Sequence, residues 1–461
     1  MDVVTAIRQQ PMTPFRWYAV SLCILCGAID GLDLLLVSYA LPHLPDGFAS
    51  GEQKGLLISL GFVGYAVGSA VIAPYADRVG RKRLVVGALF AAAVILAATT
   101  LAPNAEVMMF TRLLTGVAVG VMLPLAHVLG DEYASQNRRG LAVALVTLGF
   151  PLGSLLGGMA SLVIIKAFDG AWQALFWFGA LVSLGVTLLV WLTLPESPVY
   201  LAGRRSDTSA DRISAIVRRM KLTGVDPAAQ PARAEAAHSS SNSGKAGVLS
   251  SRYRVRSLLI WGGYTCGILG YYFINSWTPQ LISTAADNVE TGALMATVIS
   301  IGAIVGGLLF AIFTLRVIPT KLCWIALVVG VVAQIAFAMT MAGAIAYVSA
   351  VLLGMGMQAG MSAYMTSAAR LYPAEIRARG LGLMGGFSRV GSITAPLLVG
   401  ALLTVVTARA MYLTSSVIVL IAGVAAFALW RNTRYEFDTQ DDAASETPEE
   451  ATDASASVAR T

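Results

Sequence analysis

Two acidic residues in the first long apolar segment are the first candidates for chemistry. Asp30 and Asp33 stand about halfway along the apolar run from Trp17 to Tyr39, and a spacing of three residues places them on one helix face. Carboxylates inside a bilayer are costly and are found mainly where they serve a function. Two close like charges titrate apart, so that one acid can hold a proton at neutral pH. The pair is therefore predicted to couple protons.

A basic residue in a later apolar run is the second candidate. Arg389 lies near the middle of the run 380–404, where an arginine is costly unless it faces a wet cavity or a carboxylate. Its planar guanidinium can bind a carboxylate through two parallel hydrogen bonds. We expect Arg389 to bind a substrate carboxylate; a structural pair with an acid on a neighbouring helix is the alternative.

Further polar and aromatic residues in the apolar runs are assigned to substrate binding. Tyr271 and Asn275 share a helix face and suit stacking and hydrogen bonding with an aromatic ring, and Trp277 follows close behind them. Gln358, in another run, is treated in the same way. Tyr and Trp near a membrane interface are also common as belt residues. For Arg112, near the outer edge of its run, coupling, structural and substrate-contact roles all stay open.

Twelve apolar segments must position these side chains. The chain has 461 residues, of which 56% are hydrophobic and 13% charged, whereas soluble domains carry roughly 25% charged residues. A membrane-spanning helix needs roughly 20 apolar residues. The fold class is therefore an all-α membrane protein with twelve transmembrane helices in two six-helix halves. The expected spans are 17–40, 54–76, 84–103, 107–130, 140–166, 171–194, 257–281, 291–315, 322–341, 344–369, 380–404 and 409–431.

The positions of the basic residues predict sidedness. If the N-terminus is cytoplasmic, the outer loops carry only Lys54, Lys166 and Arg409 of the 32 lysines and arginines. Lys and Arg stay on the cytoplasmic side when loops are short. Both termini are therefore predicted to be cytoplasmic, with the chain in the inner (cell) membrane. This distribution also accounts for the net charge of +6 without a nucleic-acid partner.

The spans divide the chain into five regions. These are a cytoplasmic N-terminus (1–16), a six-helix bundle (17–194), a cytoplasmic central loop (195–256), a second bundle (257–431) and an acidic cytoplasmic tail (432–461). In the central loop, residues 209–222 have the pattern of a basic amphipathic helix at the inner face. Residues 225–251 and the acidic tail are predicted to be disordered.

A charged loop joins the second and third spans. Asp77, Arg78, Gly80, Arg81 and Lys82 form the string Asp-Arg-x-Gly-Arg-Lys, in which the glycine supplies a tight turn and the charges can bridge helix ends. We expect these bridges to break and remake as the two halves rock, so the five residues are assigned to gating. The string resembles the hallmark of the major facilitator superfamily, which implies the same twelve-helix fold.

Other strings extend this resemblance over residues 15–435. They include the glycines at 149, 153 and 157, the string Pro-Glu-Ser-Pro at 195–198 and the loop 372–380. Within the superfamily, Asp30-Gly-Leu-Asp33 resembles the Asp-Gly-Phe-Asp string of the aromatic acid:proton symporters, and Trp277, Glu132 and Arg389 match further positions of that group. The resemblance implies import of a small carboxylate, most like a hydroxybenzoate, driven by a proton gradient without a cofactor.

Alternatives within and outside transport stay open at this point. The Pro-Glu-Ser-Pro string also suits a sugar or metabolite symporter, and drug export and a non-transporting receptor are further readings. The sequence contains no nucleophile–base set, metal cluster or phosphate loop, so we expect no enzyme, no metal site and no coupling to ATP. The expected partners are the bilayer, the carboxylate substrate and the proton, with a monomer as the working unit.

Overall fold

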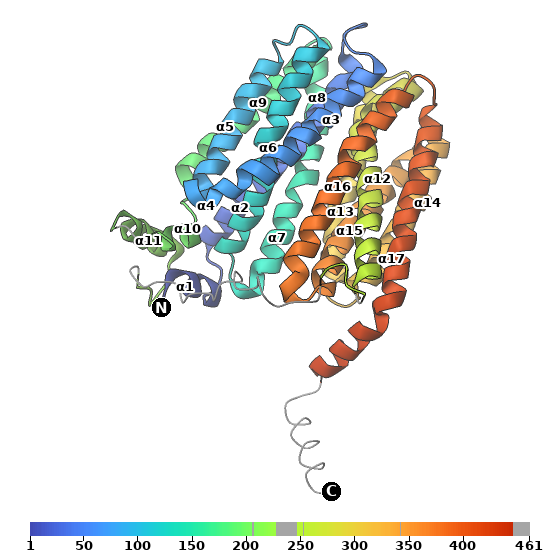
Figure 1. Ribbon diagram of the computed structural model, residues 1–461. Helices are drawn as coiled ribbons and strands as arrows, with labels where there is room; N and C mark the ends of the chain where they lie inside the picture. Colours follow the sequence, from blue (N-terminus) through green and yellow to red (C-terminus); the bar gives the residue numbers. More distant parts are fainter. Residues whose placement is uncertain (205–206, 227–246, 252, 342, 446–461) are drawn as a thin grey trace, which may run out of the picture.

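A computed structural model describes residues 1–204, 207–226, 247–251, 253–341 and 343–445 (Figure 1). Within these ranges the chain is helical and contains no strand. The long helices of the first half are α2 (Pro14–Ala40), α3 (Gly51–Val67), α5 (Arg81–Thr99), α6 (Ala105–Tyr133), α7 (Arg139–Thr147), α8 (Gly149–Ala167) and α9 (Trp172–Thr193). Those of the second half are α12 (Arg254–Ala286), α13 (Val289–Phe313), α14 (Pro319–Thr340), α15 (Ala344–Leu371), α16 (Ala374–Leu402) and α17 (Ala408–Ser445).

Short helices mark one end of the bundle. Helices α1 (Val3–Gln9), α10 (Pro198–Ala202) and α11 (Asp207–Met220) lie there together, and we call this side the α11 end (Figure 1). Between α3 and α5 the chain forms a π turn, η2 (Gly68–Ile72), a 3₁₀ turn, η3 (Ala73–Tyr75), and α4 (Ala76–Val79). Two further 3₁₀ turns are η1 (Leu41–His43) and η4 (Gln136–Arg138).

Eleven helical stretches of the described residues are long and apolar enough to cross a membrane. They correspond to eleven of the twelve expected spans. Helix α16 corresponds to the other: it has 29 residues, but Arg389 and the glycine, serine and threonine residues around it make it less apolar. It packs against α3 and α12 inside the bundle, so it takes the place of the remaining expected span. The prediction of an all-helical membrane protein is confirmed.

The two predicted cytoplasmic segments have different outcomes. Helix α11 covers most of the expected amphipathic stretch, and its apolar residues Ile213, Ile216 and Met220 are buried against the protein. Disorder from residue 432 is wrong as far as Ser445, because α17 continues to that residue. The sequence contains no glycine or proline between Arg431 and Pro448 that would stop a helix there. Residues 446–461 and 227–246 lie outside the described residues.

Close backbone contacts hold the first half together. A side chain added at Gly153 of α8 would place its Cβ 1.8 Å from the carbonyl oxygen of Ala28 on α2, and one at Gly149 would lie 2.6 Å from that of Ile24. Only glycine permits the two backbones to approach this closely. The contacts of Gly149 and Gly153 fix α2, which carries both central aspartates.

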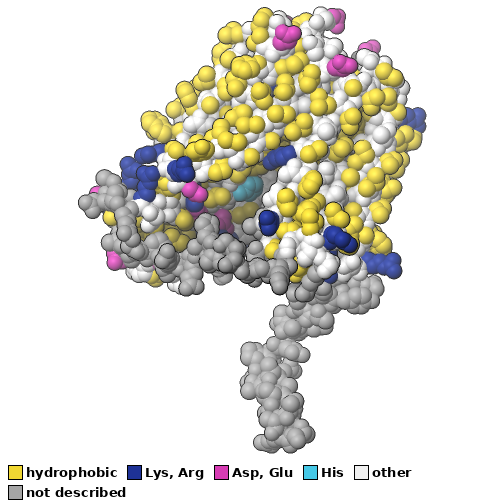
Figure 2. Space-filling model, in the orientation of Figure 1, with side chains coloured by type: hydrophobic (Ala, Val, Ile, Leu, Met, Phe, Trp, Pro, Cys, Tyr) yellow, Lys and Arg dark blue, Asp and Glu magenta, His cyan; other side chains and the backbone are white. Residues whose placement is uncertain are grey.

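The halves meet at the end opposite α11 and separate toward the α11 end. At the closed end a Cβ on Gly55 of α3 would lie 2.8 Å from the carbonyl oxygen of Pro396 on α16. Deeper in the bundle, the Ser154 hydroxyl of α8 and the Ser300 hydroxyl of α13 are 2.6 Å apart, and the Ser59 hydroxyl donates to the Ile393 carbonyl at 2.9 Å. Figure 2 shows the surface hollowed between the halves toward the α11 end. The chain is therefore closed on one side and open on the other.

Candidate substrate and coupling site

Asp33, one of the two central acids, forms a buried ion pair. Arg112 of α6 donates to Asp33 of α2 at 3.4 Å, and both side chains are 3% exposed. The Arg112 guanidinium also donates to the Thr115 hydroxyl at 3.0 Å and lies over the Phe176 ring, 5.1 Å from its centroid. Asp33 is therefore neutralised by a partner in its own half. The substrate-binding role of Arg112 stays a prediction, because its contacts here are made within the first half.

Asp30, the other central acid, has no such partner. Asp30 lies one turn before Asp33 and is 1% exposed, yet its Oδ1 atom makes no hydrogen bond among the described residues. The nearest charges that act on it are those of Arg389 and Asp33. A buried carboxylate without a hydrogen bond is unfavourable as an anion. The two acids that the sequence places on one face thus differ: Asp33 is paired with Arg112, whereas the Oδ1 atom of Asp30 makes no hydrogen bond among the described residues.

Arg389 joins the halves at the level of Asp30. It belongs to α16 of the second half, but its guanidinium lies over the ring of Tyr65 on α3, 4.2 Å from the centroid. The hydroxyls of Tyr264 and Tyr272 on α12 are also within electrostatic range. The side chain is half-buried rather than sealed. This arrangement presents a cation to the space between the halves, where a ligand carboxylate could reach it.

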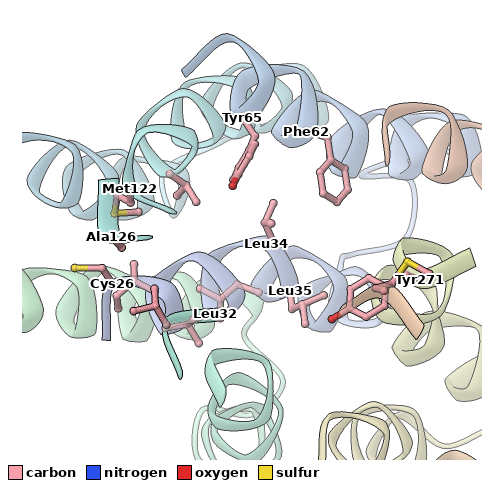
Figure 3. Packing of buried hydrophobic residues seen from close by; sticks show 14 of the residues in the cluster. Cys26, Leu32, Leu34, Leu35, Phe62, Tyr65, Met122, Ala126 and Tyr271 are labelled. Carbon is pink, nitrogen blue, oxygen red and sulfur yellow. The ribbon is translucent and has the colours of Figure 1, made fainter. Parts of the chain in front are cut away.

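Aromatic rings from three helices pack against one another beside this position. Tyr272 of α12 packs edge-on against Phe62 of α3 with centroids 4.4 Å apart, and Tyr271 lies 6.3 Å from Phe150 of α8. Figure 3 shows Phe62 and Tyr65 pointing from α3 toward α2, with Tyr271 approaching from the second half. These rings contact one another in the edge-to-face and tilted geometries that aromatic side chains prefer.

The other predicted binding residues take different places. The Tyr271 hydroxyl donates to Oε1 of Gln358 on α15 at 3.0 Å, so these two candidates meet. The Asn275 side chain donates to the Tyr271 carbonyl of its own helix at 2.8 Å. Trp277 has 0% exposed surface and packs in the core. In this conformation Tyr271 and Gln358 stand beside the site, whereas Trp277 contributes to the packing of α12.

The predicted gating loop is tied to the end of α6 and to the segment 195–198. Arg81 contacts Asp77 at 3.1 Å and also pairs with Glu132 at the end of α6. It donates to the Ser197 hydroxyl at 3.3 Å. The carboxylate of Asp77 is 75% exposed, whereas that of Glu132 is 8% exposed. Arg81 is therefore the centre of a charged cluster at the α11 end, and Glu132 is its buried partner.

The backbone of the same loop is bound by Glu196. Gly80 adopts φ +113°, a backbone conformation that favours glycine, and it lies close to the Glu196 carboxylate. The backbone N–H of Lys82 donates to Glu196 Oε1 at 2.8 Å. Arg78 lies over the Tyr75 ring at 5.8 Å. The three strings singled out separately in the sequence, at 77–82, 132–133 and 195–198, form one cluster.

Sequence reasoning missed three aromatic residues near the central site. Tyr65 lies against Arg389, and Phe62 and Phe150 pack against Tyr272. In the sequence these three residues stand singly in apolar runs without a charged neighbour. The strings that contain Glu132 and Glu196 were recognised, but their contacts with Arg81 and Lys82 were found only by the tertiary packing.

Comparison with known proteins identifies the family. The model of the Major Facilitator Superfamily matches residues 23–347 and 260–459. A gallate transporter of Pseudomonas putida is 30% identical over 417 residues, which cover 88% of this chain and 89% of that protein. A 4-hydroxybenzoate transporter of Pseudomonas aeruginosa is 29% identical, covering 85% and 87%. A 3-(3-hydroxy-phenyl)propionate transporter of Escherichia coli is 28% identical, covering 89% and 93%.

Solved structures agree on the fold. The xylose transporter of Escherichia coli, in a partially occluded inward open conformation, superposes with a TM-score of 0.69 at 16% identity, covering 91% of this chain and 98% of that one. An inward-facing bacterial homologue of the lysosomal transporter Spinster gives 0.66 at 17% identity, covering 91% and 98%. The matching family and the relatives are membrane transporters and not enzymes. The chain belongs to the major facilitator superfamily, and within it resembles transporters of aromatic acids.

Proposed function

We propose that the chain is a proton-coupled symporter that imports a small aromatic carboxylate such as a hydroxybenzoate. The observation that carries this proposal is the position of Arg389, which lies between the halves over Tyr65 and within range of the unpaired Asp30. The relatives named as transporters of gallate, 4-hydroxybenzoate and 3-(3-hydroxy-phenyl)propionate have substrates that combine an aromatic ring with a carboxylate. Their shared chemistry matches a site built from a cation and aromatic rings.

The substrate carboxylate binds Arg389 in this scheme. The guanidinium of Arg389 lies over the Tyr65 ring. It offers two parallel N–H donors to a carboxylate. The substrate ring then lies among Phe62, Tyr65 and Tyr272, where edge-to-face contacts are already present. Tyr271 and Gln358 offer a hydroxyl and an amide to a ring hydroxyl. Charge therefore selects the acid group, and the aromatic rings select the ring.

Asp30 links substrate binding to the proton. As an anion it attracts Arg389 and competes with the substrate carboxylate for the same cation. Protonation of Asp30 removes this competition, so that Arg389 is available to the substrate. When the proton leaves on the other side, the charge of Asp30 returns and favours release. Asp33 is held by Arg112 and tunes this exchange through its position one turn away.

The gating loop acts at the α11 end, which we assign to the cytoplasm. The partners of Arg81 and Lys82 described above belong to the first half and to the segment 195–198 that follows it, and the structure is open at this end (Figure 2). Closure of the α11 end would bring the second half toward this cluster, where its charges can form new contacts. The bias of Lys and Arg supports cytoplasmic termini in the inner membrane.

A proton-flux assay with a panel of aromatic acids tests the proposal. The purified chain in proteoliposomes should alkalinise the proton-rich side when 4-hydroxybenzoate or a related acid is added, and should accumulate the labelled acid when a pH gradient is imposed. A protonophore should abolish accumulation but not exchange. Uptake that follows only the substrate gradient, with no proton movement, would contradict proton coupling while leaving aromatic acid transport intact.

A further inference from the structure

A second cavity lies on the flank of the first half at the α11 end, away from the central site. Its volume is about 590 Å³, and it is bordered by the start of α5, the end of α9 and one face of α11. Four basic residues line it, together with one acid, and we call it the basic pocket. The charged residues are Lys82, Arg83, Arg212, Arg219 and Glu196. Figure 2 shows Lys and Arg side chains gathered between α5 and α11.

The positive charge of the basic pocket is largely uncompensated. The acid is already engaged, since Glu196 Oε1 accepts hydrogen bonds from the backbone N–H groups of Lys82 and Ser197 at 2.8 and 3.0 Å. Lys82 Nζ and Arg219 donate to main-chain carbonyls, which fix the side chains without neutralising them. Arg83 and Arg212 form no ion pair with any residue that the structure describes. An anion would therefore be attracted to this pocket.

The surroundings of the basic pocket are those of a membrane surface. The pocket lies at the first turn of the α5 span, and the flank beside it carries exposed apolar side chains, among them Phe90 at 53%, Trp191 at 58% and Leu192 at 66%. Gly87 lines the pocket, and no heavy atom lies within 4 Å of the position that a Cβ would occupy there. A cationic recess therefore opens directly onto an apolar surface.

We propose that the basic pocket binds the headgroup of an anionic phospholipid of the inner leaflet. The phosphate meets the guanidinium groups of Arg83 and Arg212, whose planar geometry suits phosphate oxygens, and the acyl chains lie along α5 and α9. Basic pockets on the cytoplasmic side of helical bundles are suited to anionic headgroups. The occupant connects α11 to α5, the helix that begins with Arg81 of the gate, and so restrains the loop where the gate forms.

Lipid binding to the purified full-length chain tests this assignment without any transport measurement. Native mass spectrometry would follow titration with phosphatidylglycerol and with phosphatidylcholine of the same acyl chains, and glycerol 3-phosphate would serve as the soluble phosphate. The test variant is Arg83→Ala/Arg212→Ala. The matched control is Arg138→Ala/Arg218→Ala, which removes two exposed basic residues of the same end that do not line the pocket.

We expect the native chain to prefer phosphatidylglycerol, and the test variant to bind it roughly 25-fold more weakly, about fivefold per charge removed. The control should change the affinity by less than about twofold, because its residues face solvent. Equal weakening by both variants would overturn the assignment to the pocket. Equal binding of the two lipids would overturn the anionic class. Displacement by glycerol 3-phosphate at the lipid's own concentration would make this a site for soluble phosphate and overturn the lipid.

Discussion

The unequal environments of Asp30 and Asp33 predict that the same substitution has two different results. Asp33→Asn removes the partner of Arg112, a cation that is 3% exposed. Removing one member of a buried pair typically lowers the free energy of unfolding by about 3–5 kcal/mol. Asp30→Asn removes an acid whose Oδ1 makes no hydrogen bond among the described residues. Its cost to folding is expected to be about 1 kcal/mol or less.

The functional results should run in the opposite order. Asp30→Asn cannot release a proton, so it should lose accumulation driven by a pH gradient while retaining exchange of labelled for unlabelled substrate. Asp33→Asn should retain some gradient-driven uptake in the fraction that stays folded, because the exchanging acid is still present. The double Asn variant should combine the stability loss of Asp33→Asn with the coupling loss of Asp30→Asn.

Both quantities can be measured on the same preparations. Unfolding in mixed detergent micelles gives the stability of each variant, and pH-jump uptake and counterflow in proteoliposomes give its coupling. The reasoning would be refuted if Asp30→Asn accumulated substrate at the native level under a pH gradient. It would also fail if Asp33→Asn were as stable as the native chain, because the pair with Arg112 would then contribute nothing to the free energy of unfolding.

Three further predictions concern the gate, the closed end and the sidedness. Asp77→Asn should slow uptake with little loss of stability, because its pair with Arg81 is exposed and such pairs contribute about 0–1 kcal/mol. Glu132→Gln should lower the unfolding temperature more than Asp77→Asn does. Uptake at the native rate in Asp77→Asn would remove this loop from gating. Gly55→Ala places a Cβ 2.8 Å from the Pro396 carbonyl oxygen, whereas the Cβ of Gly185→Ala meets no heavy atom within 4 Å. Only Gly55→Ala should therefore slow counterflow. Equal counterflow rates in the two variants would contradict tight closure between α3 and α16. Asp46→Cys should react with an impermeant thiol reagent on intact cells and Asn137→Cys should not, both residues being exposed in loops; the reverse pattern would invert the topology.

The fold could be predicted from the sequence because it depends on the composition of long segments. Twelve apolar runs with few charges inside them leave helices as the only way to satisfy the backbone in a bilayer. The helix ends differ from the expected spans mainly by extra polar turns, as where α12 begins at Arg254. The tail was harder, since acidic composition predicts disorder, whereas α17 extends to Ser445.

The site could be predicted only in part, because spacing along one helix says nothing about its neighbours. Asp30 and Asp33 share a face, but the difference between them arises from Arg112 on α6 and Arg389 on α16. Tyr65 carries no distinguishing neighbour in sequence, although it lies directly beneath Arg389. The charges within apolar runs could be singled out from the sequence, whereas the single aromatic residues beside them could not.

The central claim is that Arg389 selects a carboxylate, and competition between an acid and its amide tests it most directly. Uptake of labelled 4-hydroxybenzoate would be measured against unlabelled 4-hydroxybenzoate and 4-hydroxybenzamide, in the native chain and in Arg389→Lys. We predict that the acid competes with the native chain at least tenfold better than the amide. Lysine keeps the charge but not the planar pair of donors, so Arg389→Lys should raise the half-saturation concentration about tenfold or more and narrow this preference. Equal competition by acid and amide in the native chain would contradict the account.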